Sequence, residues 1–169
     1  MAATGSCLCG AVRFRIDPAP RAVYFCHCGQ CRKAQGSAFV ASVPVPVAHF
    51  TLVSGADALC CYRATPHKGR YFCGQCGSPI YSFVDGGDTL RVRAGTLDAG
   101  VELQPAAHIF TADPAPGTKS ATACRATRAS NPGADATQAS EAWQRLPVAV
   151  AEHHFREWTT RQPRGKGLR

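Results

Sequence analysis

Apolar and polar residues alternate in short runs over the first part of the chain. In the run AVRFRI, the apolar Val12, Phe14 and Ile16 alternate with arginines, as expected for a strand with one buried face. Similar short runs occupy residues 39–43, 50–53, 59–63, 70–72, 79–83 and 89–94. The turn-forming sequences SGAD, TPHKG and DGGD separate several of these runs. The pattern predicts an all-β fold of short antiparallel strands, with one or two turns of helix over residues 30–35.

The pattern changes at about Asp113. Residues 113–169 are rich in Ala, Thr, Ser and Pro, and most of this segment shows neither a helical nor a strand period. A segment with so few large apolar side chains buries too little surface to offset the loss of chain entropy on folding. We therefore expect one domain over residues 1–112, followed by a tail of low order over residues 113–169.

The number and spacing of the cysteines favour a metal-binding protein. The chain has ten cysteines among 169 residues, and it shows neither a signal peptide nor an apolar run long enough to span a membrane. We expect a cytoplasmic protein, in which thiols stay reduced and clustered cysteines are metal ligands more often than disulfides. Seven of the ten have the spacing of metal ligands, whereas the adjacent Cys60 and Cys61 and the isolated Cys124 do not.

The sequence FCGQCGSPI has the form of a metal-binding knuckle. It places Cys73 and Cys76 two residues apart, so that both sulfurs can bind one ion across a tight turn. Gly74 and Gly77 allow the positive φ that such a turn needs. Thiolate sulfur is the preferred ligand of structural zinc. This motif supplies two of the four ligands of such a site.

A second pair of cysteines, in the sequence GSCLCG, completes a set of four. If the chain is extended there, Cys7 and Cys9 face the same way and Leu8 faces the other. This pair, together with the distant knuckle, predicts a closed site with four cysteine ligands.

The sequence VYFCHCGQC holds three more cysteines and one histidine. In an extended chain Cys26 and Cys28 share one face, His27 points away from them, and Cys31 returns to that face through the following turn. Three protein ligands with an open position are typical of catalytic zinc. The alternative is a closed structural site, completed by a remote ligand such as Cys60, Cys61, His49, His67 or His108.

Five segments resemble, in order and spacing, the glutathione-dependent formaldehyde-activating enzyme family, which also contains the centromere protein V domain. They are GSCLCGAVRF, CHCGQCRKAQGSAF, FCGQCGSPIY, GTLD and PAAHIF, and together they cover residues 4–112. The resemblance implies a β-tent, an all-β zinc-binding fold, with two Zn²⁺ ions per chain. It implies a structural zinc held by Cys7, Cys9, Cys73 and Cys76, and a second, catalytic zinc held by Cys26, Cys28 and Cys31.

The resemblance also implies an activity. The family name refers to the condensation of formaldehyde with glutathione to S-hydroxymethylglutathione, which is carbon–sulfur lyase chemistry. Glutathione or another small thiol is then the expected partner. Arg32 and Lys33 could bind the carboxylates of such a substrate, although a solvated turn is the more common role of charged residues. His27 could shuttle protons or pack on the opposite strand face, and His108 could be catalytic or form a hydrogen bond in the core.

Two other functions remain open on the sequence alone. A non-catalytic zinc module that binds protein or nucleic acid would need a cluster of Lys and Arg on one face of the folded part. The formal net charge is +8, but residues 1–112 hold ten Lys and Arg against six Asp and Glu, without such a cluster. Thiolate ligands would reduce this charge further, so we do not expect nucleic-acid binding. A redox-sensing zinc switch would release metal first from the site of Cys26.

The segment after the last family-like motif departs from the family. With suitable synonymous codons, PGTKSATACRATR, starting at Pro116, back-translates to a sequence that reads PWNEISDGLPRYP when one cytosine is restored before it. This reading has the APW, then the LP and the aromatic residue, with which the family usually continues. Our hypothesis is that a one-nucleotide deletion at the Pro116 codon moved the following sequence out of frame. It also explains the missing hydrophobic period of the tail.

Overall fold

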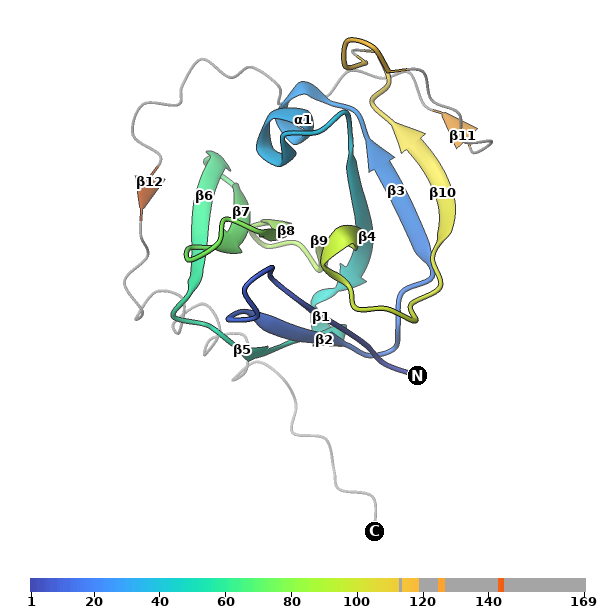
Figure 1. Cartoon of the computed structure of the whole chain (residues 1–169). Helices are drawn as coiled ribbons and strands as arrows, with labels where there is room; N and C mark the ends of the chain where they lie inside the picture. The colour runs from blue at the N-terminus through green and yellow to red at the C-terminus, as the bar shows by residue number, and fades with distance from the viewer. Residues whose placement is uncertain (113, 119–124, 127–142, 145–169) are drawn as a thin grey trace.

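The structure is a computed structural model, which describes residues 1–112, 114–118, 125–126 and 143–144 of the chain (Figure 1). The described part consists mainly of strands, with one α-helix, so that the predicted all-β class is confirmed. A small sheet has three strands in the order β1-β2-β5. Their bounds are Ala3–Ser6 for β1, Arg13–Ile16 for β2 and Phe50–Ser54 for β5.

The large sheet has nine strands in the order β11-β10-β3-β4-β9-β8-β7-β6-β12. Its strands are β3 (Ala22–Cys26), β4 (Val40–Pro46), β6 (Leu59–Thr65), β7 (Lys68–Cys73), β8 (Pro79–Val84), β9 (Thr89–Arg93), β10 (Gln104–Ile109), β11 (Arg125–Ala126) and β12 (Trp143–Gln144). Two short 3₁₀ turns, η1 (Val47–His49) and η2 (Ala94–Thr96), follow β4 and β9.

Most neighbouring strands of the large sheet are antiparallel, as predicted. Strand β10 is the exception, because it pairs in parallel with both β3 and β11. The sheet curves, so that β6 and β10 lie on opposite sides of the molecule, and α1 (Gly29–Gln35) lies between these sides near the start of β4 (Figure 1). The pairing of β3 with β10 brings the cysteine-rich end of β3 next to a segment about eighty residues later in the chain.

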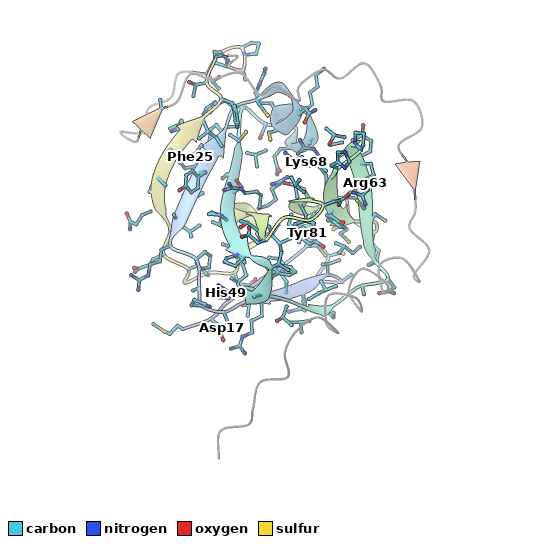
Figure 2. All side chains as sticks on the ribbon, turned by 180° about the vertical axis from the view of Figure 1, so that it is seen from behind. Asp17, Phe25, His49, Arg63, Lys68 and Tyr81 are labelled. Carbon is cyan, nitrogen blue, oxygen red and sulfur yellow. The ribbon has the colours of Figure 1, made fainter. Side chains whose placement is uncertain are left out.

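The main core lies between the two sheets. Val12, Phe14 and Ile16 are buried, whereas Arg13 and Arg15 are exposed, which confirms the alternation read from the sequence. The ring of Phe14 stacks on Phe50 with 5.3 Å between centroids, and Phe50 packs edge-on against Tyr81 of the large sheet. Tyr81 is partly buried and is labelled near the centre of the view in Figure 2. These contacts join the small sheet to the large one.

Within residues 1–112, three strands were missing from the expectation: β1, β3 and β10. Strand β3 has the sequence AVYFC, an almost continuous apolar run, and lies between two other strands. Such central strands show no alternation, because both of their faces can be covered. Strand β10 contains Pro105 and two alanines, and both residue types are depleted in strands.

The expected tail of low order and the frameshift at Pro116 concern a segment that lies largely outside the described residues. Cys124 also lies outside them. In the described part, the single α-helix is too short to cross a membrane.

Candidate metal centres

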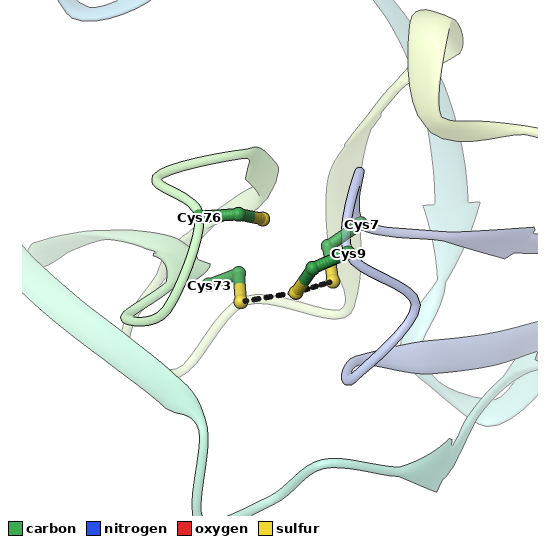
Figure 3. Close-up of side chains that lie close together, drawn as sticks. All are labelled: Cys7, Cys9, Cys73 and Cys76. Carbon is green, nitrogen blue, oxygen red and sulfur yellow. Dashed lines mark hydrogen bonds between the residues drawn. The ribbon is translucent and has the colours of Figure 1, made fainter.

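The four cysteines Cys7, Cys9, Cys73 and Cys76 form one cluster, which we call the first centre. Their sulfurs all lie within 4.8 Å of one another. The Sγ atom of Cys9 is 3.4 Å from that of Cys7 and 3.8 Å from that of Cys73 (Figure 3). Zinc–sulfur bonds of about 2.3 Å in a tetrahedron place sulfurs about 3.8 Å apart. The observed spacing therefore fits a tetrahedral metal ion.

Two turns from distant parts of the chain meet at the first centre. Cys7 and Cys9 do not lie in an extended segment, as expected from the sequence, but in a turn after β1, in which the Gly10 N–H donates to the Cys7 carbonyl at 3.0 Å. The turn still brings the two sulfurs together. Leu8 points out of it and is 88% exposed. The prediction that both cysteines bind on one side thus rested on the wrong local geometry.

The knuckle between β7 and β8 uses its two glycines in different ways. Gly77 has the predicted positive φ, at 76°. Gly74 does not, and its role is to avoid a clash, because a Cβ atom there would lie 2.6 Å from the Sγ of Cys60. The Gly77 N–H donates to the Cys73 carbonyl at 2.8 Å, which closes the knuckle.

The surroundings of the first centre favour thiolates at some of its cysteines. The hydroxyl and the backbone N–H of Ser78 lower the pKa of Cys76 to about 5. Burial opposes ionisation of Cys7, but the hydrogen bond from the Val12 N–H, together with those of neighbouring thiols, leaves the pKa of Cys7 lowered. Burial raises the pKa of Cys73 to about 12. A cation is what would allow all four sulfurs to ionise together.

The three cysteines Cys26, Cys28 and Cys31 form a second cluster, the second centre, and all three are buried. Cys26 ends β3, and Cys28 follows in an extended conformation, so that their sulfurs lie 3.6 Å apart. Cys31 is in the first turn of α1, and its N–H donates to the Cys28 sulfur at 3.4 Å. Cys28 is therefore both a member of the cluster and the N-cap of the helix.

The structure turns His27 away from the second centre, as the alternation argument predicted. The Nε2 atom of His27 lies 2.7 Å from the Nδ1 atom of His108, and both side chains are buried. The ring of His108 stacks on Phe25 with 4.8 Å between centroids. His108 thus forms a hydrogen bond in the core, and neither histidine belongs to the cysteine cluster.

The second centre is unfavourable for free thiolates. Hydrogen bonds with Cys28 and Cys31, followed by burial, raise the pKa of Cys26 far above its usual range. Three sulfurs this close and this deeply buried cannot all be charged without a cation, and a divalent metal supplies that charge. The donor set and its spacing therefore fit a metal ion, and no further cysteine, histidine or carboxylate of the described residues joins the cluster.

Apolar side chains pack against the second centre. Val40 of β4, Ile109 of β10 and the following Phe110 pack against the three cysteines. Phe110 has a φ of 56°, which is unusual for a residue with a large side chain and costs on the order of 1–3 kcal/mol. The N–H of His27 donates to the Ile109 carbonyl at 3.0 Å. The strand end is thus held in a strained conformation directly at the cluster.

Two buried arginines lie beside the second centre, and the sequence did not single them out. The Nη2 atom of Arg70 is 4.0 Å from the Cys31 sulfur, and Arg93 is 5% exposed. Burial, followed by the charge of Arg70, lowers the pKa of Arg93 to about 10, while the charges of Cys31 and Cys26 act in the opposite direction. Arg93 ends β9, where it pairs in register with Ser42 of β4, and it is buried, whereas Arg91 of the same strand is exposed.

The remaining candidate residues lie elsewhere. The Nε atom of Arg32 donates to the His27 carbonyl at 3.0 Å and fixes the cysteine loop, while Lys33 is exposed. None of the five candidates for a remote fourth ligand reaches the second centre: Cys60, Cys61, His49, His67 and His108. Of the adjacent cysteines of β6, Cys61 is buried and Cys60 half-buried, and burial raises the pKa of Cys61.

Comparison with known proteins places these centres in a family. The family model described as "Glutathione-dependent formaldehyde-activating enzyme" matches residues 2–113. A protein of Halomonas elongata named "Putative glutathione-dependent formaldehyde-activating enzyme" is 38% identical over an alignment of 85 residues, and the match covers 47% of this chain and 54% of the relative. The chain thus spans about half the length of that curated relative.

A solved structure of a Rhodobacter sphaeroides protein is also similar. It has 21% sequence identity and a TM-score of 0.44, and the match covers 60% of this chain and 99% of that one. The family assignment does not depend on it, because the family model spans both cysteine centres. The chain therefore belongs to the glutathione-dependent formaldehyde-activating enzyme family.

Proposed function

We propose that the domain of residues 1–112 is a zinc-dependent enzyme of carbon–sulfur lyase type, acting on glutathione or on the adduct of another thiol. The observation that carries this proposal is the second centre, a buried group of three cysteines to which the described residues add no fourth ligand. Three thiolate ligands and one open position are typical of catalytic rather than structural zinc. The reduced thiols of both centres suit a cytoplasmic location.

The proposal assigns two Zn²⁺ ions to the chain. Cys7, Cys9, Cys73 and Cys76 would hold a structural ion, because the four sulfurs leave no position for a substrate. Cys26, Cys28 and Cys31 would hold the second ion. At that centre, zinc supplies a Lewis acid and a binding position for a sulfur or oxygen atom of the substrate.

The reaction proposed is the addition of a thiol to formaldehyde. The thiol sulfur forms a bond with the carbonyl carbon, the π electrons of the carbonyl move to oxygen, and that oxygen receives the proton released by the thiol. No oxidant or reductant is needed. The protein's contribution is to hold the two reactants within bonding reach. Val40, Ile109 and Phe110 pack against the cysteines, and their apolar side chains would keep away water that competes for the aldehyde.

The test is a rate measurement with the full chain loaded with zinc. Formaldehyde and glutathione combine without a catalyst, so the rate of S-hydroxymethylglutathione formation is compared with the uncatalysed background, for example by exchange spectroscopy. We expect wild-type protein to raise the rate and Cys28→Ser to remove the increase. Cys60→Ser is the matched control, because Cys60 is half-buried and belongs to neither centre.

Two outcomes would contradict the proposal. Equal rates with wild-type protein and with Cys28→Ser would show that the second centre does not catalyse the addition. A rate at the background level despite full zinc loading, tested also with other small thiols, would show that the chain is not an enzyme of this type.

A further inference from the structure

Arg70 and Arg93 are buried cations without an anionic partner. Arg70 is 7% exposed and Arg93 is 5% exposed. In the described part of the chain, the ion pairs are Arg15–Asp17 and Arg63–Asp85, so that neither buried arginine contacts a carboxylate. Removing a guanidinium from water costs several kcal/mol unless charges and hydrogen bonds compensate for it. The described part of the protein therefore buries two cations whose charge is not balanced by any of its carboxylates.

Their hydrogen-bonding capacity is only partly used. The Nη2 atom of Arg70 contacts the Gln30 side-chain oxygen at 3.5 Å and the Cys31 sulfur at 4.0 Å, both of which are long. The Nη1 of Arg93 donates to the Arg91 carbonyl at 3.1 Å. The Nη1 atom of Arg70 and the Nε atom of Arg93 are buried without a partner. Buried donors of this kind are rare in proteins and point to a ligand.

Both arginines lie on the sheet beside the second centre. Arg93 pairs in register with Ser42 of β4, and Ser42 pairs with Tyr24, two residues before Cys26 on β3. Arg70 is in register with Ser82 of β8, and its Nη2 atom lies 4.0 Å from the Cys31 sulfur. Since residues in register share a face of the sheet, β4 and β9 place Arg93 on the face that carries Cys26.

The charges of this group do not balance without a ligand. A divalent metal with the three thiolates of the second centre carries one negative charge. The two guanidiniums bring the buried group to one positive charge. A ligand with one negative charge would make it neutral, and a neutral ligand would leave a buried excess charge.

We propose that Arg70 and Arg93 form an anion-binding subsite of the second centre, and that the ligand bound there is an organic thiolate whose sulfur brings the missing negative charge. This inference rests on the proposed function for the presence of the metal, and it adds the ionisation state of the ligand and the residues that select it. The guanidiniums stabilise the thiolate over the thiol, so the centre binds thiols with loss of their proton.

The experiment uses full-length protein with cobalt in place of zinc, because cobalt–thiolate absorption reports on each ligand that binds. The probes are 2-mercaptoethanol, whose only acidic group is the thiol, and 3-mercaptopropionate, which adds a carboxylate. The variants are Arg70→Gln, Arg93→Gln and Arg93→Lys. Arg91→Gln is the matched control, because it removes the same charge from an exposed position of β9, two residues from Arg93. Cobalt content and melting temperature are measured for every variant.

We expect Arg70→Gln and Arg93→Gln to weaken 2-mercaptoethanol binding by about 10- to 100-fold, as for the loss of one charged hydrogen-bonding partner. Arg93→Lys should recover part of the affinity, since it keeps the charge, and Arg91→Gln should bind as wild type.

Unchanged 2-mercaptoethanol binding in both Gln variants overturns the proposal. So does weakening that is confined to 3-mercaptopropionate, because the anion would then be a carboxylate. Loss of cobalt with no change in thiol affinity of the loaded fraction would show that the arginines serve only the cysteine thiolates, and also overturns it.

The outcome separates this inference from the proposed function. Thiol binding that depends on both arginines, in a protein without catalysis, supports the anion subsite and rejects the enzyme. Catalysis that is unchanged in Arg70→Gln and Arg93→Gln supports the enzyme and rejects the subsite. If a Gln variant fails to fold, its lysine counterpart, Arg70→Lys or Arg93→Lys, is used instead. A wild-type-like affinity for a neutral ligand such as imidazole then shows that the second centre of that variant is intact.

Discussion

The rings of His27 and His108 share a hydrogen bond of 2.7 Å between Nε2 and Nδ1, across the parallel pair of β3 and β10. His27 stands between two cysteines of the second centre, but its ring does not belong to their cluster. The contact therefore ties the cysteine loop to a strand that begins almost eighty residues later.

Loss of this contact is expected to destabilise the fold. His27→Leu removes the hydrogen bond from a buried ring nitrogen of His108, and we expect the free energy of unfolding in urea to fall by about 1–3 kcal/mol. The double variant His27→Leu/His108→Leu should lose less than the sum of the two single variants, because no buried nitrogen is left from this pair. Strictly additive losses would show that the two rings do not interact in solution.

Removal of metal from the first centre should unfold the protein. The centre joins the turn after β1 to the knuckle between β7 and β8, and Cys73 is fully buried. We expect a strong chelator to lower the melting temperature sharply, since structural zinc contributes many kcal/mol to folding. Cys73→Ser should have a similar effect, while Cys60→Ser should melt as wild type. An unchanged melting temperature in the metal-free protein would contradict the structural role of this centre.

The two glycines of the knuckle should respond differently to alanine. At Gly74 a Cβ atom would lie 2.6 Å from the Cys60 sulfur, so Gly74→Ala should cost about 1–3 kcal/mol by overpacking. Cys60→Ala removes that sulfur, and the double variant should recover part of the loss. At Gly77 the space is open and φ is 76°, so Gly77→Ala should cost about 1 kcal/mol through backbone strain alone, with no rescue by Cys60→Ala. Equal rescue at both positions would disprove this distinction.

Replacement of a buried arginine should stabilise the fold. Arg93→Met exchanges an unpaired buried cation for an apolar side chain, and we expect the free energy of unfolding to rise by about 1 kcal/mol or more. The comparison is Arg63→Gln, which breaks a half-exposed ion pair with Asp85 at 2.7 Å and should change stability by about 1 kcal/mol or less. Marked destabilisation by Arg93→Met would show that the cysteines alone already compensate for the charge of Arg93.

The reading frame after Pro116 can be tested directly. Resequencing of the gene should show one additional cytosine at the Pro116 codon. A chain that continues with PWNEISDGLPRYP adds several large apolar residues, so we expect a higher melting temperature than for the chain with the present ending. A confirmed present frame, together with equal melting of the two chains, would contradict the hypothesis.

The sequence predicts much of the fold because its short apolar runs are separated by turn-forming residues. Phe14 and Arg15 of β2 show the expected alternation of buried and exposed side chains clearly, and the first residues of β8 alternate in a similar way. The parallel pairing of β10 with β3 could not be predicted from the sequence. The small residues of β10 form no local pattern that specifies which strand the segment pairs with.

The two centres were predictable from spacing, but their surroundings were not. A short spacing brings cysteine sulfurs together in either a turn or a strand, so the clusters form as predicted although the local geometry of Cys7 and Cys9 differs from the expectation. The burial of Arg93 depends on which strands flank β9, and the position of Arg70 beside Cys31 depends on where α1 lies. Such long-range relations leave no local pattern in a single sequence.

The parallel pair of β3 and β10 also orders events during synthesis of the chain. The first centre can assemble once the chain up to Gly77 has left the ribosome, because its last ligand, Cys76, and the N–H that closes the knuckle are then present. The loop of the second centre is complete only after Ile109 and Phe110 have been synthesised. The Ile109 carbonyl accepts a hydrogen bond from the His27 N–H, and Phe110 packs against the cysteines. A nascent chain stopped between these points would hold one finished centre and one still open to the surrounding thiols, so the two sites acquire their final shape one after the other.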